Sequence, residues 1–237
     1  MLHTTKAIVL KVIRHGDRTV VLKAYTEEFG LRSYMVRAGG KGGIPQALLQ
    51  PLNRLDLVVN EQPERDIHTI REARVDRPYK NVPFDAVRGT LALFVQEVLY
   101  KVLRGEAADP AMYGFIQEAL EAMDTSTEIR NYPLIFLLRL SAELGFSPAP
   151  PMNGEDAFDM REGEFIKGVA PHGHTLGPPH STHLISLLEV GFGTMTAPVI
   201  PGTQRRELLD HLLLYFRMHI EGLGELRSPA VLHQALG

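Results

Sequence analysis

The hydrophobic pattern of this chain changes once, near residue 80, and that change limits the folds it can adopt. Before this point, short apolar and β-branched segments alternate with turn signals. We expect strands at residues 5–13, 18–26, 31–37, 52–60 and 67–75. Five short strands joined by turns predict a small closed β-barrel or a small sandwich.

After Pro78 and Pro83, the apolar residues recur at helical spacing instead. We expect helices at residues 85–104, 109–123, from Thr127 or Glu128 to Gly145, 183–190, 204–222, and after Ser228. Asp109 is suited to cap the second helix, with Pro110 at its first position. The chain therefore reads as a β-domain followed by an all-helical part.

One stretch of the helical part breaks this pattern. Residues 146–182 are rich in Pro, Gly and His, and within them Phe158 to Ile166 favours a short hairpin. We interpret the stretch as a long excursion from the helical core. The predicted domains are then 1–80 and 81–237, the second carrying this excursion.

Charge divides at the same place as the hydrophobic pattern. The whole chain has a net charge of −3. Its first 80 residues carry 14 Lys and Arg against 9 Asp and Glu, whereas the remaining 157 carry 11 against 19. The front is therefore about +5 and the rest about −8. A small basic β-domain is typical of proteins that bind single-stranded nucleic acid.

Cations and tyrosines are interleaved along the predicted strands. Lys23 and Tyr25 share one strand face, and so do Arg32 and Tyr34, because side chains alternate. Cations suit phosphates and rings suit bases. The residues that we expect to bind DNA are Lys11, Arg14, Arg18, Lys23, Arg32, Arg37 and Lys41, with Tyr25 and Tyr34 as stacking rings. Tyrosines half-buried at a strand edge are equally expected of a plain barrel.

Nucleotide-binding and catalytic motifs are missing. The Gly-rich stretch around Lys41 lacks the Ser or Thr and the glycine spacing of a phosphate-binding loop, so it is either a backbone-rich nucleic-acid contact or a solvated mobile loop. No G-x-S-x-G, H-E-x-x-H or G-x-G-x-x-G occurs. We therefore expect no enzyme and no cofactor.

Cysteine is absent, which excludes disulfides, thiolate catalysis and cysteine-ligated zinc. His172, His174, His180 and His183 lie within twelve residues and are compatible with a zinc site. Their Pro- and Gly-rich surroundings favour a solvated loop, so we expect no metal and leave the question open. The chain has no long apolar run and no signal-peptide pattern, which predicts a cytoplasmic, metal-independent protein.

The opening sequence, TKAIVLKVIRHGDRTVVLKAYTEEFGLRSYMVRAGGKGG, resembles the N-terminus of the bacterial RecO recombination-mediator family. The segments that carry the resemblance are Ile8-Val9-Leu10, Tyr25-Thr26, Gly30, Arg37 to Gly43, Leu49-Gln50-Pro51-Leu52, the helix with Glu97, and Leu137-Leu138-Arg139-Leu140 followed by Leu144-Gly145-Phe146-Ser147-Pro148. They follow one another in the family's order over most of the chain.

The resemblance implies an N-terminal OB-fold barrel and a helical domain. It implies a DNA repair and recombination protein that binds single- and double-stranded DNA, anneals complementary strands and helps to load recombinase on DNA coated by single-strand-binding protein (SSB). The implied partners are RecR and the acidic, Phe-terminated tail of SSB, for which Arg130 and Arg139 are the candidate ligands here. Many relatives carry a four-cysteine zinc module after the "LGF-x-P" segment, and this chain cannot form it.

One rival interpretation stays open at this stage. A positive barrel also suits an acidic protein, so the chain is alternatively an assembly adaptor that does not bind DNA. The sequence does not define the oligomeric state, the strand preference or the surface that meets RecR.

Overall fold

The computed structural model describes all 237 residues except 1, 41, 63, 105–106, 195–197 and 236–237. The chain divides into two compact units, Met1–Leu120 and Glu121–Gly237. The boundary between these units falls inside a helix and not at residue 80. The predicted division at 1–80 and 81–237 therefore stays a prediction about where separable domains lie.

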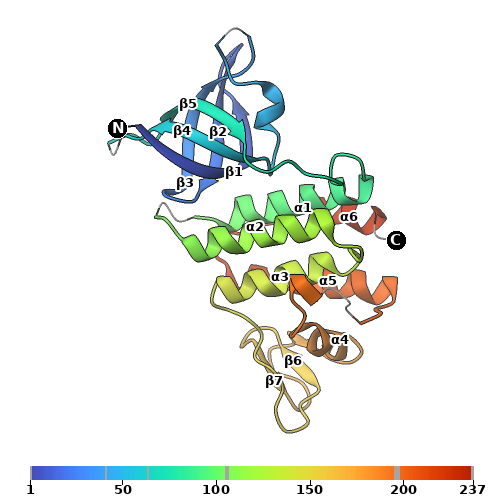
Figure 1. The fold of residues 1–237 in the computed structure, drawn as a ribbon. Helices are drawn as coiled ribbons and strands as arrows, with labels where there is room; N and C mark the ends of the chain where they lie inside the picture. Colours follow the sequence, from blue (N-terminus) through green and yellow to red (C-terminus); the bar gives the residue numbers. More distant parts are fainter. Residues whose placement is uncertain (1, 41, 63, 105–106, 195–197, 236–237) are drawn as a thin grey trace. The chain divides into compact units, whose positions relative to one another are not determined.

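The first unit opens with a closed five-stranded barrel (Figure 1). Its strands are β1 (Leu2–Arg14), β2 (Thr19–Thr26), β3 (Gly30–Arg37), β4 (Arg54–Asn60) and β5 (His68–Val75). They follow the order β1-β2-β3-β5-β4, and a short 3-10 helix, η1 (Gln46–Leu49), precedes β4. This confirms the predicted barrel, an OB-fold, over the sandwich.

The barrel is held most weakly between β3 and β5. These two strands are parallel and pair only through Tyr34 with His68 and Met35 with Thr69, whereas the other pairs are long and antiparallel. Alternate residues of the strands fill the interior: Ala7, Val9, Val20, Leu22, Ala24, Tyr34, Val36, Leu55, Leu57 and Val59, together with Leu49 of η1. Closing the gap between β3 and β5 therefore depends on side chains more than on the backbone ladder.

Helix α1 (Ala86–Val102) covers the middle of β1. Asp85 caps the helix by accepting hydrogen bonds from the N–H groups of Val87 and Arg88. Gln96 donates its side-chain amide to the carbonyl of Leu10 at 2.6 Å. Because α1 lies on the outer side of β1, this strand is apolar on both faces, and Ile8 and Leu10 are fully buried.

Helix α2 (Pro110–Thr125) begins as predicted. The Asp109 carboxylate accepts a hydrogen bond from the N–H of Met112 at 2.9 Å, and Pro110 is the first helical residue. A missing N–H costs nothing at that position.

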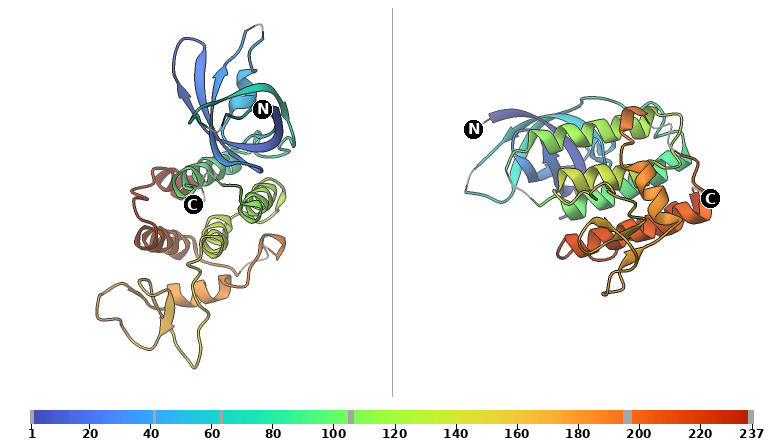
Figure 2. Two further views of the ribbon diagram at one scale, coloured as in Figure 1. Left: turned by 90° about the vertical axis from the view of Figure 1, so that its left-hand side faces the viewer. Right: turned by 90° about the horizontal axis from the view of Figure 1, so that it is seen from below.

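The second unit contains α3 (Tyr132–Glu143), α4 (His180–Leu187), α5 (Gly202–His219) and α6 (Ser228–Ala235). Figure 2 shows α3, α4 and α5 packed on one another. Helix α3 begins later than the predicted start at Thr127 or Glu128. Proline is tolerated only in the first turn, and Pro133 therefore fixes the start at Tyr132.

A small three-stranded sheet forms in the excursion, with the order β7-β6-β8. Its strands are β6 (Ala157–Asp159), β7 (Glu164–Ile166) and β8 (Thr175–Leu176). The predicted hairpin between Phe158 and Ile166 is confirmed as β6 and β7, while β8 was not predicted. In the described part of the chain, no helix is long and apolar enough to span a membrane.

Candidate nucleic-acid interface and a second basic site

Three of the predicted arginines gather at one end of the barrel. Arg14 ends β1, Arg18 lies in the turn before β2, and Arg37 ends β3. Thr19 pairs with Arg37, and the N–H of Ala38 donates to the carbonyl of Arg18 at 2.9 Å, so the three positions are neighbours. All three arginines are exposed. We call this set the arginine end.

The glycine-rich loop beside the arginine end is tightly folded. The N–H of Gly39 donates to the carbonyl of Ile44 at 2.8 Å, and the N–H of Ile44 donates back to the carbonyl of Arg37 at 2.9 Å. A Cβ added to Gly43 would lie 2.2 Å from the Gly39 carbonyl oxygen, so only glycine fits there. Lys41, the predicted cation of this loop, lies outside the described residues.

The remaining predicted cations lie elsewhere on the barrel. Lys11 places its Nζ 4.4 Å from the ring centre of Tyr100 on α1, a cation–π contact. Lys23 and Arg32 line a cavity whose other residues belong to the opposite ends of the strands. The structure thus brings Arg14, Arg18 and Arg37 together, whereas Lys11 and Lys23 pair with each other farther along β1 and β2, and Arg32 lies on β3.

Neither predicted stacking tyrosine faces solvent. Tyr25 is 3% exposed and stacks on Tyr113 of α2, with ring centres 6.4 Å apart. Burial, with Asp109 nearby, raises the pKa of Tyr25 to about 12. Tyr34 is fully buried in the barrel, and burial together with Glu61 raises its pKa. Both rings belong to the core of this unit, and we do not carry them into the proposed interface.

Arg32 and Tyr34 do share a strand face, as predicted, but that face points into the barrel. Both donate to the carboxylate of Glu61: Arg32 Nε at 3.3 Å and the Tyr34 hydroxyl at 2.9 Å. His68 places Nε2 3.3 Å from the same carboxylate, and its Nδ1 accepts a hydrogen bond from the N–H of Gln62 at 3.1 Å. This Glu61 cluster ties β3 to β5 where the backbone pairing is shortest.

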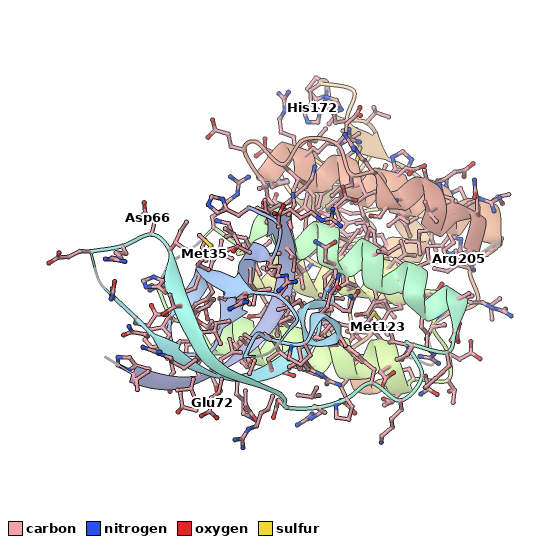
Figure 3. All side chains as sticks on the ribbon, turned by 90° about the horizontal axis from the view of Figure 1, so that it is seen from above. Met35, Asp66, Glu72, Met123, His172 and Arg205 are labelled. Atoms are coloured by element: carbon pink, nitrogen blue, oxygen red, sulfur yellow. The ribbon has the colours of Figure 1, made fainter. Side chains whose placement is uncertain are left out.

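A cavity of about 490 Å³ lies beside the Glu61 cluster. Its walls come from strands β1, β2, β3 and β5, from the loops between β2 and β3 and between β4 and β5, and from the segment that follows α1. The lining residues are His3, Lys23, Phe29, Leu31, Arg32, Ser33, Glu61, Arg65, Asp66, His68 and Arg104. Figure 3 shows Asp66 at the outer end of the loop between β4 and β5. We call this the barrel cavity.

A second basic site lies in the second unit. Arg130 precedes α3, and Arg205 and Arg206 lie near the start of α5, where Figure 3 labels Arg205. Together they surround a shallow hollow of about 10 Å³, which is lined by Pro133, Leu134, Leu209 and Leu232, with His233 at its side. Burial lowers the pKa of Arg205, and the positive charges of Arg130 and Arg206 lower it further. We call this site the arginine hollow.

Sequence reasoning found only one residue of the hollow. The sequence predicts Arg130 as a ligand, whereas it predicts Arg205 and Arg206 only as part of the helix at residues 204–222. Arg139, the other predicted ligand, instead donates to the carbonyls of Leu188 and Val190 at 2.7 and 2.8 Å. It thereby holds the chain that leaves α4, and it does not line the hollow.

The four clustered histidines separate into two places. His172 places its Nε2 3.0 Å from the Asp159 carboxylate, and the ring of His174 stacks on the ring of His172. His180 and His183 sit on α4 and contact Glu207 and Gln204 of α5 at 2.8 and 2.6 Å. Among the described residues, no group of three or more His, Asp or Glu side chains is placed to hold a metal. That the protein is metal-independent stays a prediction.

Comparison with known proteins identifies the family. The family models described as Recombination protein O N terminal and Recombination protein O C terminal match residues 1–79 and 83–150. The DNA repair protein RecO of Porphyromonas gingivalis is 32% identical over 242 residues, covering 98% of each chain. The chain belongs to the RecO family. Further RecO relatives come from Bacteroides fragilis, 30% identical over 99% of each chain, and from Christiangramia forsetii, 27% identical over the full length of each.

Membership of the RecO family gives this chain a role in DNA repair and recombination. It agrees with the OB-fold barrel of the first unit, for which the strand pattern alone predicted a small closed barrel or a small sandwich. The matches to the relatives from Porphyromonas gingivalis and Christiangramia forsetii cover 98% and 100% of this chain and of the relative, so each extends over both the barrel and the helical part of this chain. The RecO assignment does not by itself say which residues touch DNA or a partner.

Proposed function

We propose that this chain binds single- and double-stranded DNA through the arginine end of its barrel and anneals complementary strands. The observation that carries the proposal is the gathering of three exposed arginines from separate elements around a tightly folded glycine loop. Arg18 lies against that loop, since its Nη1 is 3.9 Å from the position of a Cβ added to Gly40. The glycines at positions 39, 40, 42 and 43 have no side chains, which lets a phosphate backbone approach these cations closely.

The chemistry of annealing requires cations on an open surface. Two complementary strands repel each other through their phosphates, and bound arginines release counterions and reduce that repulsion. Arg14, Arg18 and Arg37 are exposed, and arginines on an open surface contact the phosphate backbone, which is the same in every DNA sequence. This is the behaviour required of a protein that must hold strands before they are paired.

We further propose that the arginine hollow receives the acidic, Phe-terminated tail of SSB, which places the protein on SSB-coated DNA for recombinase loading with RecR. An acidic peptide that ends in an aromatic residue requires an apolar floor beside cations. The hollow measures only about 10 Å³, and Leu134, Leu209 and Leu232 beneath it are nearly fully buried, so the Phe ring of the tail would lie on its rim. Arg130 and Arg206 supply the cations. The unit around them belongs to the acidic part of the sequence, so the hollow is a local exception in charge.

The DNA-binding part is tested with paired double variants. Arg18→Gln with Arg37→Gln removes two charges from the arginine end, and Arg71→Gln with Arg74→Gln removes two exposed charges from β5. We expect the first pair to raise the Kd for an oligonucleotide about tenfold at 0.1 M salt and to reduce the slope of log K against log salt by about two. Equal Kd values for both pairs would overturn the proposal and favour the protein-adaptor alternative.

The tail-binding part is tested by fluorescence anisotropy with a labelled acidic peptide ending in Phe. Arg130→Gln with Arg206→Gln is compared with Arg161→Gln and Arg217→Gln, a pair of exposed arginines of the same unit. We expect about a tenfold weaker Kd for the hollow pair only, and loss of annealing on SSB-coated strands with annealing of bare strands retained. Binding that the hollow pair leaves unchanged would contradict the assignment.

A further inference from the structure

The barrel cavity differs from the arginine end in both shape and chemistry. The arginine end is an exposed surface, whereas the cavity is a hollow of about 490 Å³, within the range of about 300–1,000 Å³ typical of small-ligand sites. It lies at the other end of the strands, where β3 and β5 barely pair. Nothing in the annealing proposal uses it.

Aromatic side chains form one part of the cavity wall. The rings of His3 and Phe29 meet edge to face, with centres 5.4 Å apart and planes at 80°. Leu31 adds an apolar surface on the same side. Flat, partly apolar ligands with a π-face fit such a wall, because they stack on a ring and bury little polar surface.

Charged side chains form the rest. Glu61 is saturated by Arg32, Tyr34 and His68, so the floor of the cavity is a polar surface whose acceptors are already used. Lys23 lines the cavity from the outer face of β2, and Arg65 from the exposed loop between β4 and β5. Arg104 and Asp66 also line the cavity, and Arg104 donates its Nε to the carbonyl of Lys101 at 3.1 Å. We assign Lys23 and Arg65 as the cations that face an anion on the ligand.

We propose that the barrel cavity holds one unstacked nucleobase of a single DNA strand, with the neighbouring phosphate on Lys23 and Arg65. This inference rests on the proposed DNA binding and adds strand selectivity to it. A base in a duplex is stacked and paired, and it enters such a cavity only after flipping out, which costs a few kcal/mol. The cavity therefore favours single strands, whereas the arginine end accepts single and double strands alike.

The test compares two double variants on two substrates. Lys23→Gln with His3→Ala alters the cavity, and Arg18→Gln with Arg37→Gln alters the arginine end. For an oligo(dT) strand, we expect the cavity variant to raise the Kd about five- to tenfold. For a blunt hairpin duplex of equal phosphate number, we expect less than about a twofold change. The arginine-end variant should weaken both substrates by the same factor.

Two results would overturn the inference: an unchanged Kd for oligo(dT), or an equal loss for both substrates. Failure of the proposed DNA binding looks different, because the arginine-end variant would then leave both substrates unaffected. Thermal unfolding of each variant checks the fold, and Arg65→Gln on the exposed loop repeats the cavity test without touching a strand. Free thymidine monophosphate serves as competitor: weak competition supports a site for a strand, and competition as strong as that of the oligonucleotide would overturn the strand proposal in favour of a free-nucleotide site.

Discussion

Each of the two units of this protein contains a histidine with the same hydrogen-bond arrangement, but the carboxylates that the two histidines face have different further partners. His68 in the barrel and His172 in the excursion each accept a backbone N–H at Nδ1, from Gln62 and His174 respectively, both at 3.1 Å. An accepting Nδ1 carries no proton, so Nε2 donates, and it faces a carboxylate in both cases. The carboxylates are Glu61 and Asp159, whose side chains are 10% and 9% exposed.

The other partners of the two carboxylates differ. Glu61 is completed by Arg32 and Tyr34, which lie nearly thirty residues earlier in the chain. Asp159 is completed by the N–H groups of its near neighbours Arg161 and Glu162, at 2.9 and 3.2 Å. The first cluster therefore closes a barrel between distant strands, whereas the second shapes a local turn. Glu61 and Asp159 are equally buried, but we expect the loss of the Glu61 carboxylate to destabilise the protein more than the loss of the Asp159 carboxylate.

The largest expected effect is that of Glu61→Gln. The amide replaces a carboxylate oxygen by a donor, so one of the three donors around it loses its acceptor and the buried pair with Arg32 loses its charge. We expect the free energy of unfolding to fall by about 3 kcal/mol in urea denaturation. The matched control is Glu64→Gln on the exposed loop nearby, with a change within about 0.5 kcal/mol.

The same variant also tests how the fold supports the barrel cavity. Since Glu61 fixes Arg32 and His68 beside the cavity, Glu61→Gln should weaken oligo(dT) binding more than duplex binding at a temperature where the protein is folded. A variant as stable as the wild type would show that the closure of β3 on β5 does not depend on this cluster.

A smaller and pH-dependent effect is expected at Asp159. Burial raises the pKa of this carboxyl, but hydrogen bonds from Glu162, Arg161 and His172 lower it more, so the net pKa lies below the ordinary 3.8. A lowered folded-state pKa gives stability that is present above the unfolded value and lost as the pH falls through the folded value. At pH 7, Asp159→Asn should therefore cost about 1–2 kcal/mol.

Urea unfolding between pH 6 and pH 2 checks the sign of this linkage. The difference in unfolding free energy between the wild type and Asp159→Asn should narrow steadily as the pH falls below about 4. Asp156→Asn, next to β6, is the control that should show no such narrowing. A difference that stays constant over the whole range would mean that the Asp159 carboxylate contributes no charge-dependent stability.

The comparison also shows what the sequence was able to predict. The strands and most helices follow from apolar periodicity, and the start of α2 follows from Asp109 and Pro110, because these signals are local. The alternation of side chains along a strand correctly predicts that Arg32 and Tyr34 share one face. It does not predict which face of the strand points into a closed barrel. That depends on Glu61 and on the covering helix, and both are distant in sequence.

The candidate sites divide in the same way. Arg14, Arg18 and Arg37 are three of the seven cations that the sequence predicts for DNA binding, and strand pairing brings these three together. The arginine hollow forms only where residues of α3, α5 and α6 come together, and these helices are distant in sequence. In the sequence alone, Arg205 and Arg206 are two adjacent cations with nothing to mark them as part of a site. The separation of the four histidines has the same cause, because α4 packs on α5 while His172 and His174 stay with the sheet.

The smallest expected effect is that of metal removal, and it tests the excursion directly. His172 is hydrogen-bonded to Asp159, His180 to Glu207, and His183 to Gln204. These three histidines therefore act as hydrogen-bond partners within the folded unit. Overnight dialysis against a chelator should therefore shift the Tm by less than about 1 °C, whereas loss of a structural zinc ion removes a large part of folding stability. The control is His172→Ala, which should lower the Tm by several times that amount because it leaves the buried Asp159 oxygen without its donor. A chelator shift as large as that of His172→Ala would show that a metal, and not the hydrogen bonds of Asp159, holds the excursion of this chain, and the parallel with the Glu61 cluster would then fail.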